Sequence, residues 1–186
     1  MSTRPRSTPL TYEDFLLFPE DGKRHELMEG EHYVTPSPNT RHQTISSALH
    51  RILGPFIHEH RLGVLFAAPM DVVLSDIDVV EPDLLFVASA RKTIIQEPHI
   101  HGAPDLVIEI LSERTRKVDE VTKRKLYERY GVQEYWIVDP ELELVKVYRL
   151  TGERYGRGIE VTKEGGEVLT TPLFSGLSLP LSDLFA

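Results

Sequence analysis

The stretch PDLVIEILSE, residues 104–113, predicts a buried β-strand that carries a carboxylate within it. Residues 106–111 alternate between two faces, and both faces are apolar around Glu109. A strand of this kind is central in its sheet and covered on both sides. An unpaired ionised carboxylate there is costly, or its pKa rises until the group is neutral. Glu109 therefore requires a metal ion, a Lys or Arg, or a polar opening at the strand's end.

The rest of the chain predicts one α/β domain over residues 1–186, with a mixed β-sheet core flanked by helices. The sequence TYEDFLLF predicts a short helix, and a turn at Glu29-Gly30 predicts a hairpin. A helix is expected from about Thr40, and Gly54-Pro55 should kink or divide it. Further strands are expected at residues 63–69, 71–76, 81–89, 134–140 and 144–150, and a helix at 118–130.

Composition bounds the function classes. The 186 residues carry a net charge of -8, with 40% apolar residues and no cysteine, which excludes disulfides and thiolate metal sites. No apolar run is long enough to span a membrane and the N-terminus lacks an apolar signal core, so a cytoplasmic protein is expected. The acidic charge argues against a protein that coats nucleic acid with its whole surface. Residues 114–129 nevertheless hold seven basic and three acidic residues, a local excess of +4, as in a basic channel or a solvated helix face.

A second acid, Asp83, opens the apolar run DLLFV directly after Glu81-Pro82. If its strand neighbours that of Glu109, the two carboxylates could converge at one sheet edge. Two such groups repel unless a cation lies between them, and Mg²⁺ suits one or two carboxylates plus waters and phosphate oxygens. The alternative is an internal salt bridge or a strand-end carboxylate. A third acid, Glu26 in HELMEG, could line the same site or face solvent.

The helix at 118–130 offers a basic partner. Asp119, Lys123 and Tyr127 share a helix face, so Lys123 could extend its stem along apolar surface and direct its ammonium into a site. Lys125 and Arg124 are alternatives that a helical wheel cannot separate. The alternative role for Lys123 is an ion pair with Asp119 within the helix.

Four segments occur in a fixed order: Glu26 in HELMEG, EPDLLFV around Asp83, PDLVIEILSERT around Glu109, and KRKLYERYGVQEYWIVDP. In this combination, from about Thr11 to Leu150, the chain resembles the Uma-type family of restriction endonucleases, within the PD-(D/E)xK nuclease superfamily. The resemblance implies a restriction-endonuclease-like core and a Mg²⁺-dependent (or Mn²⁺-dependent) endonuclease that hydrolyses phosphodiester bonds in DNA.

The resemblance also implies roles for individual residues. Asp83, Glu109 and the backbone carbonyl of Ile110 would be metal ligands, and Glu26 would supply a further catalytic acid. The superfamily pattern has a lysine two residues after the glutamate, where this chain has Leu111. Lys123 would replace that lysine from the following helix, orienting or deprotonating water or neutralising charge on the phosphate.

Three basic residues follow the Glu109 strand, and they either grip DNA phosphates or belong to a solvated loop: Arg114, Arg116 and Lys117. A homodimer is expected because two-fold pairing suits cutting both strands. The rival interpretation is a catalytically inactive nuclease fold that serves as a nucleic-acid-binding or scaffold protein. A two-carboxylate glycosidase is disfavoured, because it needs no lysine and its clefts usually hold more aromatic residues.

Other motifs weigh less. Two histidine pairs have a spacing that transition metals accept, His58 with His60 and His99 with His101, but one sits at a helix end and the other in a loop. Ser112 lacks a nucleophile elbow and is expected to cap the following loop or helix.

Overall fold

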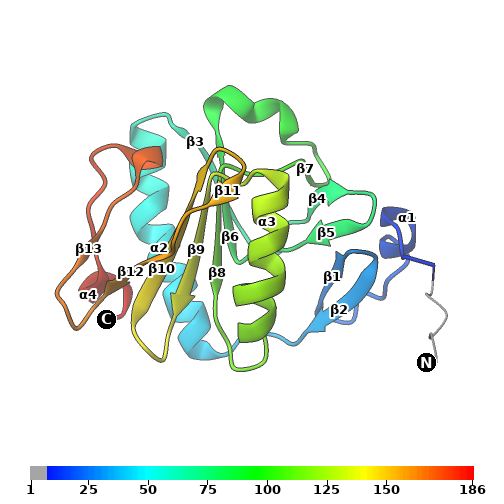
Figure 1. The fold of residues 1–186 in the computed structure, drawn as a ribbon, viewed down its shortest axis with the longest axis horizontal. Helices are drawn as coiled ribbons and strands as arrows, with labels where there is room; N and C mark the ends of the chain where they lie inside the picture. The colour runs from blue at the N-terminus through cyan, green and yellow to red at the C-terminus, as the bar shows by residue number, and fades with distance from the viewer. Residues whose placement is uncertain (1–7) are drawn as a thin grey trace.

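The computed structural model describes residues 8–186, so the first seven residues of the domain predicted over 1–186 lie outside the described residues. Figure 1 shows the arrangement of the elements. The helices and helical turns are α1 (Tyr12–Phe15), α2 (Thr40–Glu59), η1 (Ser89–Ile94), η2 (Val118–Lys123), α3 (Arg124–Tyr130), η3 (Pro172–Phe174) and α4 (Leu181–Leu184). The strands are β1 (Arg24–Met28), β2 (Glu31–Thr35), β3 (Gly63–Ala67), β4 (Val72–Ser75), β5 (Asp78–Val80), β6 (Leu84–Ala88), β7 (Ile100–His101), β8 (Leu106–Ile110), β9 (Glu134–Asp139), β10 (Leu144–Thr151), β11 (Arg154–Tyr155), β12 (Ile159–Thr162), β13 (Val168–Leu169) and β14 (Leu179–Pro180).

The larger sheet has the order β11-β10-β9-β8-β6-β3, with β12 also paired to β10. Strand β8 pairs parallel to β9 and antiparallel to β6, which places it in the interior of a mixed sheet. All five residues of β8 are buried. The predicted α/β fold with a mixed sheet is confirmed, and so is the central position of the strand that carries Glu109.

Helices cover both faces of this sheet. Helix α2 packs Ile45, Leu49 and Leu53 into one apolar cluster, with Ile108 of β8 and Trp136 of β9. On the opposite face, Leu126 and Tyr127 of α3 pack with the alternate residues of the same strands. Figure 1 shows α2 (cyan) and α3 (yellow-green) on opposite sides of the strands. The alternation in the sequence of β8 therefore reflects two separate cores.

A smaller sheet, ordered β2-β1-β5-β4-β7, packs beside α3. Its hairpin turn has positive φ at both central residues, 55° at Glu29 and 72° at Gly30, as a tight hairpin requires. A Cβ on Gly30 would lie 2.3 Å from the Cβ of Pro9, so the turn needs glycine for space as well as for its backbone angle. The predicted hairpin is confirmed, and it carries Arg24 and Glu26 on β1.

Two helix expectations need correction. Gly54-Pro55 was expected to kink or divide helix α2, and a division is wrong, because the helix runs through Pro55 to Glu59. Leu53 and Ile57 are buried on either side of the proline, and this packing outweighs one lost backbone hydrogen bond. The helix expected at 118–130 is present, but its first six residues form the π-helix η2. Within residues 8–186, no helix has the length and apolar character needed to cross a membrane.

Candidate active site

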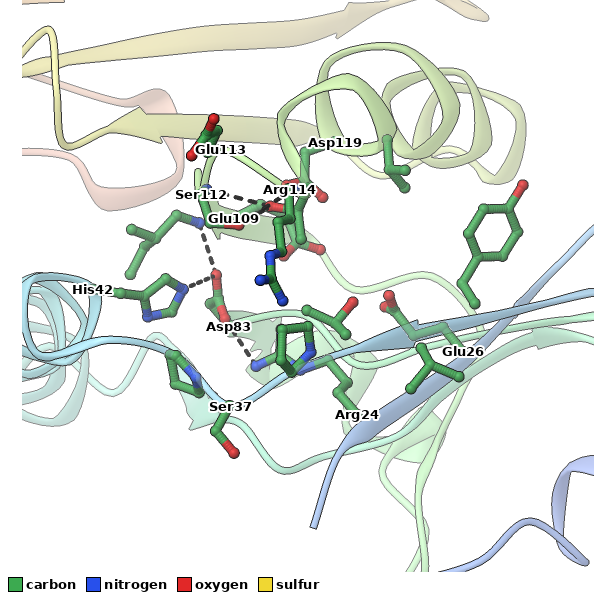
Figure 2. Close-up of a pocket in the computed structure, with 18 of the residues that line it drawn as sticks. Arg24, Glu26, Ser37, His42, Asp83, Glu109, Ser112, Glu113, Arg114 and Asp119 are labelled. Atoms are coloured by element: carbon green, nitrogen blue, oxygen red, sulfur yellow. Dashed lines mark hydrogen bonds and ion pairs between the residues drawn. The ribbon is translucent and has the colours of Figure 1, made fainter. Parts of the chain in front are cut away.

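A pocket of about 640 Å³ opens where the two sheets meet η2 and the start of α2. Its walls come from β1, from the segment that joins β2 to α2, from the start of β6, from the end of β8, and from η2. Figure 2 shows charged side chains from these elements pointing toward one another inside the pocket. The pocket thus gathers acids that are far apart in the sequence.

Asp83 lies one residue before β6 and is 3% exposed. Its Oδ1 accepts a hydrogen bond from Nη2 of Arg24 at 2.9 Å. Its Oδ2 accepts from the backbone N–H of Ile110 at 2.7 Å and contacts Nε2 of His42 at 3.0 Å. Burial alone would raise the pKa of Asp83, but the bonds from His42 and Arg24 outweigh it and lower that pKa to about 2. Asp83 is therefore a permanent anion near neutral pH.

Glu109 reaches the same pocket from β8 and is 2% exposed. Its Oε1 accepts from Nζ of Lys123 and from the hydroxyl of Tyr127, each at 2.9 Å. Burial raises the pKa of Glu109 to about 8, and the nearby Asp119 and Asp83 add to the effect against the opposing pull of Lys123. Glu109 thus holds a proton far more readily than Asp83 does.

Lys123 is shared among several carboxylates. Its Nζ lies 2.8 Å from Oε1 of Glu26, 2.9 Å from Oε1 of Glu109 and 3.7 Å from Oδ1 of Asp119. Burial would lower the pKa of Lys123, but these carboxylates raise it overall, so the side chain stays an ammonium. Burial also raises the pKa of Asp119 to about 6. One ammonium does not neutralise three buried acids.

The cluster carries an excess of negative charge. With Glu81, which accepts from Nε of Arg24 at 2.8 Å, five carboxylates surround two permanent cations, Arg24 and Lys123. Buried charges without matching partners are costly, and proteins retain them mainly where a metal ion or a reaction needs them. The imbalance makes this pocket the candidate functional site.

Local structure explains how these residues meet. Leu84 pairs with Ile108 in the antiparallel register of β6 and β8, so the start of β6 lies against the end of β8. Arg24 and Glu26 are two residues apart on β1 and therefore share one face. In η2, the wider π-helical turn carries both Asp119 and Lys123 as buried residues, and π-helical turns are frequent at functional sites.

The structure brings together four of the sequence-predicted residues: Glu26, Asp83, Glu109 and Lys123. Lys123 is the basic residue of its helix that reaches the acids, because Lys125 is exposed and Arg124 lies over the ring of Tyr148. The predicted ion pair of Lys123 with Asp119 is present, but it is longer than the contacts to Glu26 and Glu109.

The backbone of Ile110 reaches the site through its N–H bond to Asp83, and a role for its carbonyl stays a prediction. The three basic residues predicted to contact DNA differ in their surroundings. Arg114 is exposed at the pocket, and Lys117 is exposed at the start of η2. Arg116 is instead held by Asp139 and Glu141. These ion pairs leave Arg116 the least available of the three.

The other candidate residues have structural surroundings. Ser112 exchanges hydrogen bonds with Thr115 in the turn before η2, as expected for a residue that caps the following loop or helix. The ring of His60 stacks on Phe56, and Nδ1 of His99 contacts the hydroxyl of Tyr12. Neither histidine pair has a recorded third ligand, since no group of three potential ligands is present anywhere in residues 8–186.

The sequence interpretation missed two residues that contact Asp83. Arg24 could have been found, because it lies two residues before Glu26 on the same strand and therefore shares its face. His42 gives no such signal: it is a polar residue in the first turn of α2, where solvent exposure is the usual expectation. Its Nδ1 is buried and is the one such side-chain atom in residues 8–186 that lacks a hydrogen-bond partner.

The acids fit a divalent cation by charge and donor type. Within residues 8–186, the recorded bonds of Glu109 all go to Oε1, and Asp83 Oδ1 accepts from Arg24 alone. A carboxylate oxygen accepts two bonds, so Oε2 of Glu109 and one position on Oδ1 of Asp83 remain open to a metal ion. The same part of the chain holds no group of three potential ligands already arranged around one point, and Arg24 and Lys123 contact Oδ1 of Asp83 and Oε1 of Glu109.

Comparison with known proteins supports the family resemblance drawn from the sequence. The Uma2 family model, described as "Putative restriction endonuclease", matches residues 12–182. The fold resembles a crystal structure titled as a putative nuclease belonging to DUF820 from Anabaena variabilis, with a TM-score of 0.80 and 25% identity over 95% of this chain and 98% of that one. The type IIG restriction endonuclease BpuSI matches with a TM-score of 0.39 and 14% identity, over 77% of this chain and 15% of that one, which is too distant to support any inference. No curated protein matches the chain.

Proposed function

Because the chain belongs to the Uma2 family of restriction-endonuclease-like proteins, we propose that it is a Mg²⁺-dependent endonuclease that hydrolyses phosphodiester bonds in DNA, with Mn²⁺ as an alternative ion. The observation that carries this proposal is the excess of carboxylates in this cluster, where four buried acids that line the pocket, together with the half-buried Glu81 that pairs with Arg24, contact two permanent cations. A divalent ion is the partner that such an imbalance favours.

Asp83 and Glu109 would hold the ion through their open oxygens, and the carbonyl of Ile110 is the third ligand that the family resemblance implies. When bound, such an ion lowers the pKa of a water molecule and stabilises negative charge on a phosphate. The chain's own contribution is to keep Asp83 ionised through Arg24 and His42, so that a ligand is ready at neutral pH.

Lys123 would supply positive charge next to the reacting phosphate. Its raised pKa means that it keeps its proton at neutral pH, which favours a hydrogen-bond donor over a general base. Its bonds to Glu26 and Glu109 fix the ammonium within the pocket. In this role Lys123 would orient the attacking water or the phosphate and stabilise developing charge.

Arg114, exposed at the pocket, is the best-placed of the loop cations to contact a DNA backbone phosphate. A homodimer would place two such sites on one duplex and allow both strands to be cut. Both points are part of the proposal, and the oligomeric state can be checked by light scattering.

The test is cleavage of supercoiled plasmid with Mg²⁺ or Mn²⁺ by the wild type, Glu109→Gln and Glu134→Gln. Glu134 is a matched control, since it is also a buried strand glutamate but bonds Trp136 and Arg149 away from the pocket. We expect cleavage by the wild type and the control, and a loss of at least ~10²-fold in Glu109→Gln. Cleavage that survives in Glu109→Gln would refute the assignment of the site.

The rival function is a nuclease fold without catalysis, acting as a binding or scaffold protein. Two observations favour it: Leu111 replaces the strand lysine of the superfamily pattern, and residues 8–186 hold no ready-made ligand cluster. A wild type that binds DNA but cleaves neither plasmid nor linear duplex with either metal would support this rival.

A further inference from the structure

Arg24 occupies the oxygen of Asp83 that a metal ion would use. Its Nη2 donates to Oδ1 at 2.9 Å, while the other oxygen, Oδ2, already accepts from Ile110 N–H and contacts His42. Oδ2 therefore has no remaining acceptor position, and an incoming cation must approach Oδ1. Arg24 and a divalent ion would then lie against the same atom.

The guanidinium is anchored at a second point. Nε of Arg24 lies 2.8 Å from Oε1 of Glu81, and Glu81 is not among the proposed metal ligands. The side chain is 15% exposed and lines the pocket, so its outer edge faces the space where a substrate would enter. This anchor would let Nη2 leave Asp83 while Nε stays bound.

Guanidinium groups bind phosphate with the same fork of N–H donors that they offer to a carboxylate. If the guanidinium of Arg24 leaves Asp83 inside this pocket, the oxygens of a bound phosphate are the nearest anionic group that it can bind instead. The metal ion would then bind Asp83 in place of Arg24, and Arg24 would donate to the phosphate in place of Asp83. Arg24 therefore keeps the same number of charge-assisted hydrogen bonds.

We propose that Arg24 is an exchangeable counter-ion: it neutralises Asp83 in the metal-free protein, competes there with the divalent ion, and transfers to the phosphodiester when metal and DNA bind. This inference rests on the proposed nuclease function. In the metal-free protein, Arg24 lies 2.9 Å from the oxygen of Asp83 that the ion would need, so the ion must compete with a bound guanidinium.

Substitution of Arg24 should change Mn²⁺ affinity and the cleavage rate in opposite directions. Replacing Arg24 by Gln removes the competitor, so Mn²⁺ should bind the DNA-free protein about ten-fold more tightly, as expected for losing one charge-assisted hydrogen bond. The same variant lacks the phosphate contact, so its cleavage rate at saturating Mn²⁺ should fall about 10²-fold. A purely structural role would not give tighter metal binding together with slower cleavage.

The experiment is titration calorimetry of the full-length protein with Mn²⁺ alone, followed by single-turnover cleavage at saturating Mn²⁺. Arg114→Gln is the control for Mn²⁺ affinity, because it removes the same charge at the pocket without a recorded bond to Asp83. We expect less than about a two-fold change there, which separates direct competition from general electrostatics.

Arg24→Lys provides a second variant in case the Gln variant is unstable. An ammonium lacks the planar fork that lets Arg24 bind Glu81 and Asp83 together, so Mn²⁺ affinity should rise in the same direction by about two- to three-fold. Mn²⁺ affinity that is unchanged or weaker in both variants, with a wild type that cleaves DNA, overturns this inference and leaves the nuclease function standing. A wild type that neither binds Mn²⁺ nor cleaves overturns both.

Discussion

The tripeptide Pro-Asp-Leu occurs twice in this chain, at residues 82–84 and 104–106, and the aspartates of the two copies have different partners. Each aspartate lies directly before a central strand, Asp83 before β6 and Asp105 before β8. Each is almost fully buried, with 3% and 1% of the residue exposed. Neither the local sequence nor the burial separates the two carboxylates.

Their partners do separate them. Asp105 accepts from Arg91 at 3.1 Å, from the amide of Gln133 at 2.5 Å and from the backbone N–H of Ala88 at 2.8 Å. One cation and two neutral donors satisfy one anion. Such a carboxylate is complete as it stands and serves to join the start of β8 to the end of β6.

Asp83 lies at the opposite end of the same strand pair, because β6 and β8 run antiparallel. There it is one of five carboxylates that share two permanent cations. The two carboxylates differ in the ratio of cations to acids around them and not in burial, and this difference makes Asp83, rather than Asp105, the candidate functional carboxylate.

The largest expected effect comes from the same substitution at both aspartates. Asp83→Asn removes a proposed ligand and should lower Mg²⁺-dependent plasmid cleavage by ~10³-fold, since metal stabilisation of the reacting phosphate is worth several kcal/mol. Asp105→Asn should leave the cleavage rate of the folded protein within a few-fold and lower its unfolding temperature. Rates are compared per folded molecule, with circular dichroism as the check. Equal losses of cleavage rate per folded molecule in Asp83→Asn and Asp105→Asn would contradict the distinction between the two aspartates.

The second effect is the loss of unfolding free energy when the basic residue paired with each group of buried acids is removed. Lys123→Met leaves Glu26, Glu109 and Asp119 without their shared ammonium, and removing one partner from a buried ionic cluster costs about 3 kcal/mol of unfolding free energy. Arg91→Met removes the cation of Asp105, but Arg91 is 36% exposed and solvent screens the pair, so about 1 kcal/mol is expected.

Urea unfolding at pH 7 and pH 5 measures both variants. The loss in Lys123→Met should shrink at pH 5, because Asp119, whose pKa is raised to about 6, becomes protonated between the two pH values and no longer needs the ammonium. Glu109, whose pKa is raised to about 8, already holds its proton in most molecules at pH 7 and adds little to this difference. An equal loss at both pH values would mean that Lys123 stabilises the fold through its aliphatic stem rather than its charge.

Part of this arrangement was predictable from the sequence. The two-residue alternation of β8 gave Glu109 its buried position, and the helix face gave Lys123 a possible direction. The choice between Asp83 and Asp105 was not available from local pattern, because strand pairing joins residues far apart in the chain. The sequence interpretation proposed Asp83 because it opens an apolar run after Pro82 and did not consider Asp105, and the antiparallel register of β6 and β8 places Asp83 at the end of the sheet where Glu109 lies.

Other features lay outside the reach of the sequence. Helix η2 is π-helical and buries Asp119 and Lys123, and Lys123 contacts Glu26 of β1 and Glu109 of β8, which a helical wheel does not show. Helix α2 continues through Pro55 because tertiary packing of Leu53 and Ile57 outweighs local propensity. His42 reaches Asp83 only through the way α2 docks on the sheet.

The smallest expected effect is on the free energy of unfolding: removing the charge of Glu109 should stabilise the protein at high pH, whereas removing that of Asp105 should destabilise it. Between about pH 4.5, the ordinary value, and about pH 8, the folded protein binds more protons at Glu109 than the unfolded chain does, so this group's contribution to stability falls as pH rises through that window. Gln cannot ionise, and its oxygen can still accept from Lys123 and Tyr127. Glu109→Gln should therefore match the stability of the wild type near pH 5 and exceed it by on the order of 1 kcal/mol at pH 8.

Asp105→Asn should be less stable than the wild type across the same range, because it weakens the bond to Arg91. Thermal unfolding of the metal-free proteins from pH 5 to pH 8.5 tests both signs, and a Glu109→Gln variant that loses stability at pH 8 would show that the Glu109 anion is satisfied without a metal ion.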